Sequence, residues 1–188
     1  FPRFKAENRF RSFCYPQSGF RVLNSGSHIR LSKIGDIKLR YSRETAGKIK
    51  TCIVVRDIDQ WFVVLTCEQE EKEVVNLKPD IGIDAGIEKL ATLSDGTVIE
   101  NERFIRQSQR KLGKQQRWLS RKTKGSKTRV KQRIKVAKIH RKIRRQRDDL
   151  LHKTSHYLAT NYGRIVFEQL NVKGMLKNHC LAKAISDA

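Results

Sequence analysis

The residues best suited to chemistry are two carboxylates, Asp84 and Glu168, each carried by a short apolar stretch. Asp84 lies in residues 81–86, which read IGIDAG. At the two-residue period of a strand, Asp84 shares one face with Gly82 and Gly86, and the apolar residues share the other. A carboxylate between residues without side chains leaves room for a metal ion with a phosphate. The plainer interpretation is a strand end with a turn aspartate.

Glu168 ends a second apolar stretch, residues 164–171, which read RIVFEQLN. A strand that follows a long helical excursion can lie beside the first strand, which would put Glu168 near Asp84 at the edge of the sheet. Two converging carboxylates are what a pair of divalent ions needs to activate water and to stabilise the leaving oxygen of a phosphodiester. The alternative is that Glu168 only ends a strand on the surface.

The segment between the two carboxylates contains the elements that must position them. Residues 90–93 and 97–99 flank the turn sequence SDG, so the Asp84 strand begins an antiparallel three-stranded meander. This is the opening topology of the ribonuclease H-like fold, although meanders are common. From residue 102 to about 162, apolar residues recur at helical spacing with one break at residues 125–126, which predicts two long amphipathic helices.

The helical segment is strongly basic. Between Arg106 and Arg147 there are 19 Lys and Arg and no Asp or Glu, in a chain whose net charge is +22. Solvated helix faces usually mix charge signs, so we predict that these helices bind a nucleic-acid backbone. Trp118 could stack on a base, but a core anchor at the helix seam is the favoured interpretation. The predicted contact residues are Arg110, Lys111, Lys114, Arg117, Arg121, Lys122, Lys131, Arg133, Lys138, Arg141, Lys142, Arg144 and Arg145.

Residues 1–78 are predicted to form a β-rich unit, and residues 79–188 a second domain. Short strands separated by turn signals suggest a small barrel or a strongly twisted sheet, and the clearest hairpin joins residues 49–56 to residues 61–68. Either a solvated face or contact with a nucleic-acid backbone explains the cations at its outward positions. These cations are Arg21, Arg30, Lys33, Lys38, Arg40, Arg43, Lys48, Lys50 and Arg56.

Composition excludes several classes of protein. No apolar run is long enough to span a bilayer and no signal-peptide pattern is present, although an anionic membrane surface competes as a partner for the positive charge. The four cysteines are far apart, which favours neither zinc nor disulfides, and three of them resemble small buried apolar residues. We expect an intracellular, reducing compartment. The chain opens without methionine and stops abruptly, so we interpret it as a piece of a longer protein.

Several stretches together resemble the TnpB proteins, the OrfB transposases of IS200/IS605 and IS607 elements. Residues 82–86 (GIDAG) with residues 90–96 (LATLSDG) match the first RuvC motif of the family, and residues 165–175 (IVFEQLNVKGM) match the second. The basic residues 112–147 are similar to the helical insert of the family, and residues 181–188 are similar to the segment after the second motif. The resemblance runs through nearly the whole chain.

The resemblance implies an RNA-guided DNA endonuclease related to type V CRISPR effectors. It implies an α+β or α/β fold: a wedge-like β-barrel at residues 1–78, then an incomplete ribonuclease H-like (RuvC) domain with a helical hairpin at about 102–162. Asp84 and Glu168 would be catalytic and would be two of three carboxylates that bind Mg²⁺ or Mn²⁺, with two ions in the complete site. The implied partners are a DNA target and a guide RNA from the transposon end, with no membrane, in the prokaryotic cytoplasm at the nucleoid.

The chain also departs from the family. Gln169 replaces the aspartate that usually follows the glutamate. The third RuvC aspartate and the zinc ribbon lie downstream of residue 188 in relatives, so we expect no zinc and an inactive or severely weakened nuclease. Asp187 is not expected to substitute for the missing carboxylate. The alternative is a non-catalytic RNA- or DNA-binding module from a decayed copy. A ribosomal or chromatin-like basic protein would leave both carboxylate strands unexplained.

Overall fold

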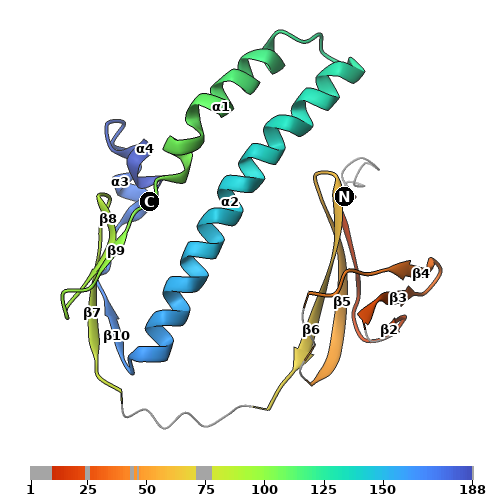
Figure 1. Cartoon of the computed structure of the whole chain (residues 1–188), viewed down its shortest axis with the longest axis horizontal. Helices are drawn as coiled ribbons and strands as arrows, with labels where there is room; N and C mark the ends of the chain where they lie inside the picture. The colour runs from red at the N-terminus through yellow and green to blue at the C-terminus, as the bar shows by residue number, and fades with distance from the viewer. Residues whose placement is uncertain (1–9, 24–25, 43–44, 46, 71–77, 188) are drawn as a thin grey trace, which may run out of the picture. The chain divides into compact units, whose positions relative to one another are not determined.

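The computed structural model describes residues 10–23, 26–42, 45, 47–70 and 78–187. The chain divides into two compact units, residues 1–73 and residues 74–188, both drawn in Figure 1. Residues 1–9 of the predicted β-rich unit and its cation Arg43 lie outside the described residues. No helix in the described ranges has the length and apolarity to cross a membrane.

Unit 1 consists of two three-stranded antiparallel sheets. The first, in the order β1-β5-β6, contains β1 (Ser12–Tyr15), β5 (Lys48–Asp57) and β6 (Gln60–Glu68). The second, in the order β2-β3-β4, contains β2 (Phe20–Leu23), β3 (His28–Leu31) and β4 (Gly35–Lys38). Ile29 and Leu31 of the second sheet share one buried core with Cys52 and Val54 of the first. Apolar residues at every second position therefore hold the two sheets together.

The predicted β5–β6 hairpin is confirmed, but the predicted barrel is not. Asp57 pairs with Gln60, so Ile58 and Asp59 form a two-residue turn in which Ile58 has φ 61°. The described strands form two open sheets and no closed barrel. A barrel needs a hydrogen-bonded ladder that continues around its whole circumference. Strand β4 has only four residues, all exposed, and ends the second sheet instead of continuing it.

Unit 2 contains one four-stranded sheet in the order β10-β7-β8-β9. Its strands are β7 (Ile81–Ala85), β8 (Lys89–Leu93), β9 (Val98–Glu100) and β10 (Ile165–Phe167). Strands β7, β8 and β9 form the predicted antiparallel meander, and β10 lies parallel to β7, as expected for a strand after a long helical excursion. The Ile81 amide donates to the Arg164 carbonyl (2.9 Å), which fixes where this parallel pair begins.

One face of this sheet packs against the second of two long helices. Helix α1 (Phe104–Ser120) and helix α2 (Lys127–Asn161) run side by side as an antiparallel hairpin (Figure 1). Leu158, near the end of α2, is buried against Ile81, Ile83 and Leu93. Burial of each such side chain contributes about 1.5–3 kcal/mol, so this contact anchors the hairpin to the sheet.

Two side chains, Ser126 and Arg129, stabilise the turn between α1 and α2. The Ser126 side chain accepts a hydrogen bond from the Arg129 amide and so caps the start of α2. The Arg129 guanidinium donates to the carbonyls of Leu119 and Lys122, both at 2.8 Å. It thereby satisfies carbonyls at the end of α1 that have no partner within that helix. Arg129 is therefore a structural cation within the basic segment.

A second polar contact ties the end of α2 to the sheet. The Tyr162 hydroxyl donates to an Asp95 carboxylate oxygen, and the Thr97 amide donates to the other oxygen at 2.8 Å. Hydrogen bonding by Tyr162, then by Thr97, lowers the pKa of Asp95. The Tyr162–Asp95 hydrogen bond also raises the pKa of Tyr162.

Two short helices, α3 (Val172–Met175) and α4 (Ala182–Ile185), follow β10.

We expect Tyr162→Phe to lower the free energy of unfolding at neutral pH. The depressed pKa of Asp95 stabilises the fold above about pH 4, and this contribution is lost as the pH falls through the folded-state pKa. The raised pKa of Tyr162 stabilises the fold below about pH 10, and this contribution is lost as the pH rises. Urea unfolding at several pH values should therefore show the largest difference in free energy of unfolding between the unmodified chain and Tyr162→Phe at about pH 4 to 10. In an Asp95→Asn background, Tyr162→Phe should have little further effect. If Tyr162→Phe lowers the free energy of unfolding equally in the Asp95→Asn background, the stabilising role of the Tyr162–Asp95 hydrogen bond is contradicted.

Candidate functional site

Asp84 lies on the exposed face of β7. Ile81 and Ile83 are 3% and 6% exposed and face the core, whereas Asp84 is exposed and pairs across the ladder with Thr92. The predicted alternation is therefore present. Ala85 belongs to the apolar set by period but is exposed, because the core beneath the sheet ends before it.

The two glycines beside Asp84 have different roles. A Cβ atom on Gly82 would lie 3.7 Å from Ser94 Cβ, an ordinary contact, so the sheet there is open but does not demand glycine. A Cβ atom on Gly86 would lie 2.9 Å from the Lys89 carbonyl oxygen, which is a clash. Gly86 is thus required by the turn into β8. Only Gly82 matches the sequence argument that glycine leaves room beside the carboxylate.

The structure brings Glu168 to Asp84. In the parallel ladder Phe167 pairs with Ile83, so Glu168 and Asp84 each come one residue after paired positions. Both carboxylates line a single surface hollow together with Gly82 and Ser94. Within the described ranges, His, Cys, Asp and Glu form no group of three or more that could hold a metal ion. The hollow therefore offers two carboxylates from two adjacent strands.

Asp187 lies elsewhere and has a structural role. Its carboxylate accepts hydrogen bonds from the amides of Ile105 (2.7 Å) and Arg106 (3.0 Å) at the start of α1, and the Arg147 guanidinium lies 3.2 Å away. Arg103, the residue before α1, provides no side-chain cap. Asp187 therefore caps α1 from a distant part of the chain, in agreement with the expectation that it does not complete the Asp84 pair.

The predicted contact residues of α1 gather on one side of that helix. At about 100° per residue, Arg110, Lys111, Lys114, Arg117 and Trp118 fall within roughly 120° of its circumference. All five are exposed. Arg121 and Lys122 follow directly after the end of α1 and are also exposed. The other side of α1 packs on α2, where Gln132 donates to the Gln115 side chain at 2.7 Å.

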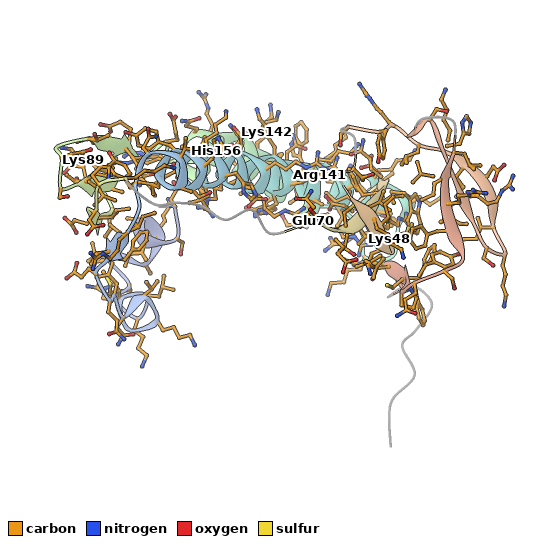
Figure 2. All side chains as sticks on the ribbon, turned by 90° about the horizontal axis from the view of Figure 1, so that it is seen from below. Lys48, Glu70, Lys89, Arg141, Lys142 and His156 are labelled. Carbon is orange, nitrogen blue, oxygen red and sulfur yellow. The ribbon has the colours of Figure 1, made fainter. Side chains whose placement is uncertain are left out.

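The predicted contact residues of α2 divide between two sides. Lys138, Arg141, Lys142 and Arg145 line one groove along the helix, and Lys131 lies on the same side by helical period. Figure 2 shows Arg141 and Lys142 among the side chains of α2. Arg133 and Arg144 lie roughly 100° further around the helix. All seven are exposed except Arg141, which is half-buried.

Some cations have partners within the chain. Arg147 and Arg129 of α2 serve the structural contacts described above, and neither belongs to the predicted contact set. In unit 1, Arg30 pairs with Asp36 (2.6 Å) and Lys50 pairs with Glu68 (2.6 Å), so the charge of these two outward cations is locally balanced. The first turn of α1 and that of α2 contain no acidic residue.

Two sequence-based interpretations are corrected by burial. Trp118 is 42% exposed and is not a core anchor, because α1 turns Leu112, Gln115 and Leu119 toward α2 instead. Of the cysteines expected to be buried, only Cys52 is fully so, and burial raises the pKa of its thiol. Cys14 is exposed because it points away from the core of unit 1. All four cysteines are free thiols.

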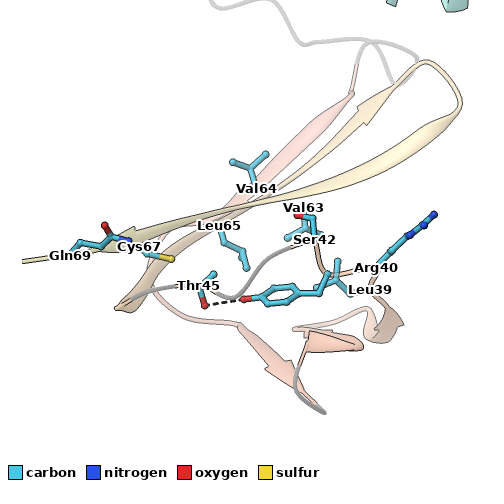
Figure 3. A pocket seen from close by; sticks show the side chains of 10 residues that line it. Leu39, Arg40, Ser42, Thr45, Val63, Val64, Leu65, Cys67 and Gln69 are labelled. Carbon is cyan, nitrogen blue, oxygen red and sulfur yellow. Dashed lines mark hydrogen bonds between the residues drawn. The ribbon is translucent and has the colours of Figure 1, made fainter. Parts of the chain in front are cut away.

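Unit 1 has its own hollow, between β6 and a second wall formed by residues 39–42 and Thr45 (Figure 3). Leu39, Val63 and Leu65 supply its apolar lining, and Arg40 lies at its edge. The Tyr41 hydroxyl donates to Thr45 Oγ1 at 2.9 Å. This lining contains a single cation and no carboxylate, so it offers no match to the chemistry of the Asp84 hollow.

Unit 2 thus belongs to the mixed α and β proteins: a strand hairpin and a basic helical hairpin connect two parallel strands, one of which contains Asp84 while the other is followed directly by Glu168. The family model OrfB of IS605, described as a probable transposase, matches residues 63–179. The chain belongs to this OrfB (TnpB) family, which confirms the resemblance seen in its motifs.

Similar proteins come from several bacteria. The chain is 38% identical to InsQ of Escherichia coli K12 (95% of this chain, 44% of the relative) and 39% identical to a protein of Streptomyces pristinaespiralis (100% and 48%). It is 30% identical to MT2953 of Mycobacterium tuberculosis (100% and 46%). All three are named "putative RNA-guided DNA endonuclease". The chain spans about half the length of these relatives.

We expect Asp187→Ala to destabilise unit 2 by about 1–2 kcal/mol, because the start of α1 loses its cap and Arg147 loses its carboxylate. Urea unfolding followed by helical circular dichroism measures this change. Asp149→Asn is the matched control: Asp149 is exposed and pairs with Lys153 four residues away, so its removal should cost less than about 0.5 kcal/mol. Equal effects of the two changes would contradict the capping role.

Proposed function

We propose that this chain is part of an RNA-guided DNA endonuclease in which Asp84 and Glu168 hold the metal ions that hydrolyse phosphodiesters. The observation that carries the proposal is the convergence of these two carboxylates on one hollow at the β7–β10 pair. Family membership and the names of the relatives support the same activity. The DNA target and the guide RNA are the partners that these names suggest.

The donor set fits Mg²⁺ or Mn²⁺. Both ions prefer carboxylate and phosphate oxygens, and Mg²⁺ is often bound by only one or two carboxylates together with the phosphates of a substrate. The lining of the hollow contains no cysteine or histidine, the ligands that zinc prefers. When bound there, the ions would activate water and stabilise the leaving oxygen. With two carboxylates in the described hollow, we expect weak metal binding and little or no cleavage by this chain.

The remaining residues of unit 2 bind and position the substrate in this proposal. Gly82 leaves the sheet beside Asp84 open to a phosphate, and the Gly82 amide holds the Ser94 hydroxyl (3.1 Å) against the strand. The cations of α1 and α2 would bind backbone phosphates, since their exposed sides contain few carboxylates. Binding and chemistry therefore rest on different residues, and mutations should separate them.

A second candidate is a nucleic-acid-binding module without catalysis. It is favoured by the absence of a third carboxylate near Asp84 and Glu168 among the residues that the structure describes. The basic hairpin would keep its role in this case. A measurement of metal binding distinguishes the two candidates, because a module without catalysis does not require a divalent ion at the β7–β10 pair.

We expect this chain to bind Mn²⁺. We expect the Asp84→Ala variant to lose this binding, because removal of one carboxylate leaves a single ligand. Calorimetry at salt high enough to screen the basic helices measures the binding. Glu100→Gln is the matched control, since Glu100 is an exposed carboxylate on β9 of the same sheet and should be dispensable. Equal loss in the control, or no Mn²⁺ binding in any form, would favour the non-catalytic module.

We expect the double variant Arg141→Gln/Lys142→Gln to weaken DNA binding and to flatten its dependence on salt. Each lost phosphate contact should reduce the slope of log K against log salt concentration by about 0.9 for duplex DNA. Fluorescence anisotropy at several salt concentrations gives this slope. Lys153→Gln is the control, because Lys153 is paired with Asp149 outside the predicted contact set. An unchanged slope in the double variant would place both cations on a merely solvated face.

A further inference from the structure

We propose that Trp118 is a stacking platform for an unpaired base of single-stranded nucleic acid, with the surrounding cations of α1 holding the adjoining phosphates. This inference rests on the proposed nucleic-acid binding by the hairpin and specifies which residue contacts a base. Its structural basis is a large aromatic ring that is 42% exposed on the basic side of α1, near the C-terminal end of the helix.

The surroundings of Trp118 match a nucleotide better than a protein partner. Across α1, all of which the structure describes, Trp118 is the one large apolar side chain that is exposed. Helix α1 contains no Asp or Glu, so cations are the only charged neighbours on that helix. A protein interface of this kind would need a contiguous apolar patch. An isolated ring among cations instead fits a ligand that combines flat apolar faces with negative charge.

Lys114 reinforces this match. Its ammonium lies 5.1 Å from the centroid of the Trp118 ring, one helical turn away on the same side of α1. A nucleotide carries a planar base and a phosphate close together. The ring and the ammonium can therefore contact both parts of one nucleotide, the base by stacking and the phosphate by charge.

The occupant must be single-stranded, because the base faces of a duplex are already stacked on one another and are inaccessible to a side chain. RNA and DNA both provide unpaired bases, so the shared chemistry is the exposed face of a base. Duplex DNA would meet only the cations of this surface. The proposal thus predicts a difference between single strands and duplexes that charge alone does not produce.

The first test compares the affinities of the chain and its variants for single-stranded RNA, single-stranded DNA and duplex DNA of equal length. We expect Trp118→Ala to weaken binding of both single strands by about fivefold to 100-fold and to leave duplex binding nearly unchanged. The salt dependence should stay the same, since no charge is removed, whereas Lys114→Gln should reduce the slope by about 0.7 for a single strand. Trp118→Phe should retain most of the affinity.

Leu151→Ala is the matched control for lost apolar area. Leu151 is 54% exposed on α2, outside the basic segment, and its truncation should leave all three affinities unchanged. Circular dichroism confirms that each variant keeps its helices. If Trp118→Ala lowers the affinity for single strands and for duplex DNA equally, the proposal that Trp118 stacks on a base is wrong.

The second test is spectroscopic. The chain has two tryptophans, so Trp61→Phe leaves Trp118 as the single indole fluorophore. Stacking on a base should quench its emission as a single strand is added, with saturation at the same concentration as binding. Binding without quenching, together with an unchanged affinity of Trp118→Ala, would overturn the role of Trp118 while nucleic-acid binding by the hairpin stands. No binding of any nucleic acid by the unmodified chain would overturn both.

Discussion

The parallel pairing of β10 with β7 is the contact on which the rest of unit 2 depends. These strands are adjacent in space but are separated in sequence by a hairpin of strands and two long helices. A parallel pair requires a crossover, because the chain must return to the same end of the sheet before it can run in the same direction. Here the crossover contains the basic hairpin. One backbone arrangement therefore brings two carboxylates together and attaches a cationic surface to the same sheet.

Long-range polar contacts orient the crossover helices. Asp187 caps the start of α1 and is held by Arg147 of α2, while Arg129 satisfies carbonyls at the end of α1. These contacts join both ends of α1 to α2. The burial of Leu158 and the Tyr162–Asp95 bond then attach the far end of α2 to the sheet. Apolar packing supplies much of the stability, and the polar contacts set which residues face outward.

The positive charge of the hairpin is divided by these contacts. Arg129 and Arg147 are committed to carbonyls or to a carboxylate inside the fold, whereas most of the predicted contact cations are exposed, along one side of α1 and two sides of α2. Like charges in such number repel one another within a helix, so the hairpin tolerates an electrostatic cost that a polyanion would relieve. Trp118 lies on the same side of α1 as these exposed cations and gives the surface a flat apolar feature among them.

The sequence by itself determined the local elements and the family. Two-residue alternation predicted β7 and the meander, helical spacing predicted two helices with a break near Ser126, and the motifs around Asp84 and Glu168 identified the family. Tertiary structure decided what periodicity does not encode. Among the described residues, it showed two open sheets in unit 1 in place of a barrel, the exposure of Trp118, and the commitment of Asp187, Arg147 and Arg129 to helix ends. Periodicity reports which residues share a face, but the partner of that face is set by packing between residues far apart in the chain.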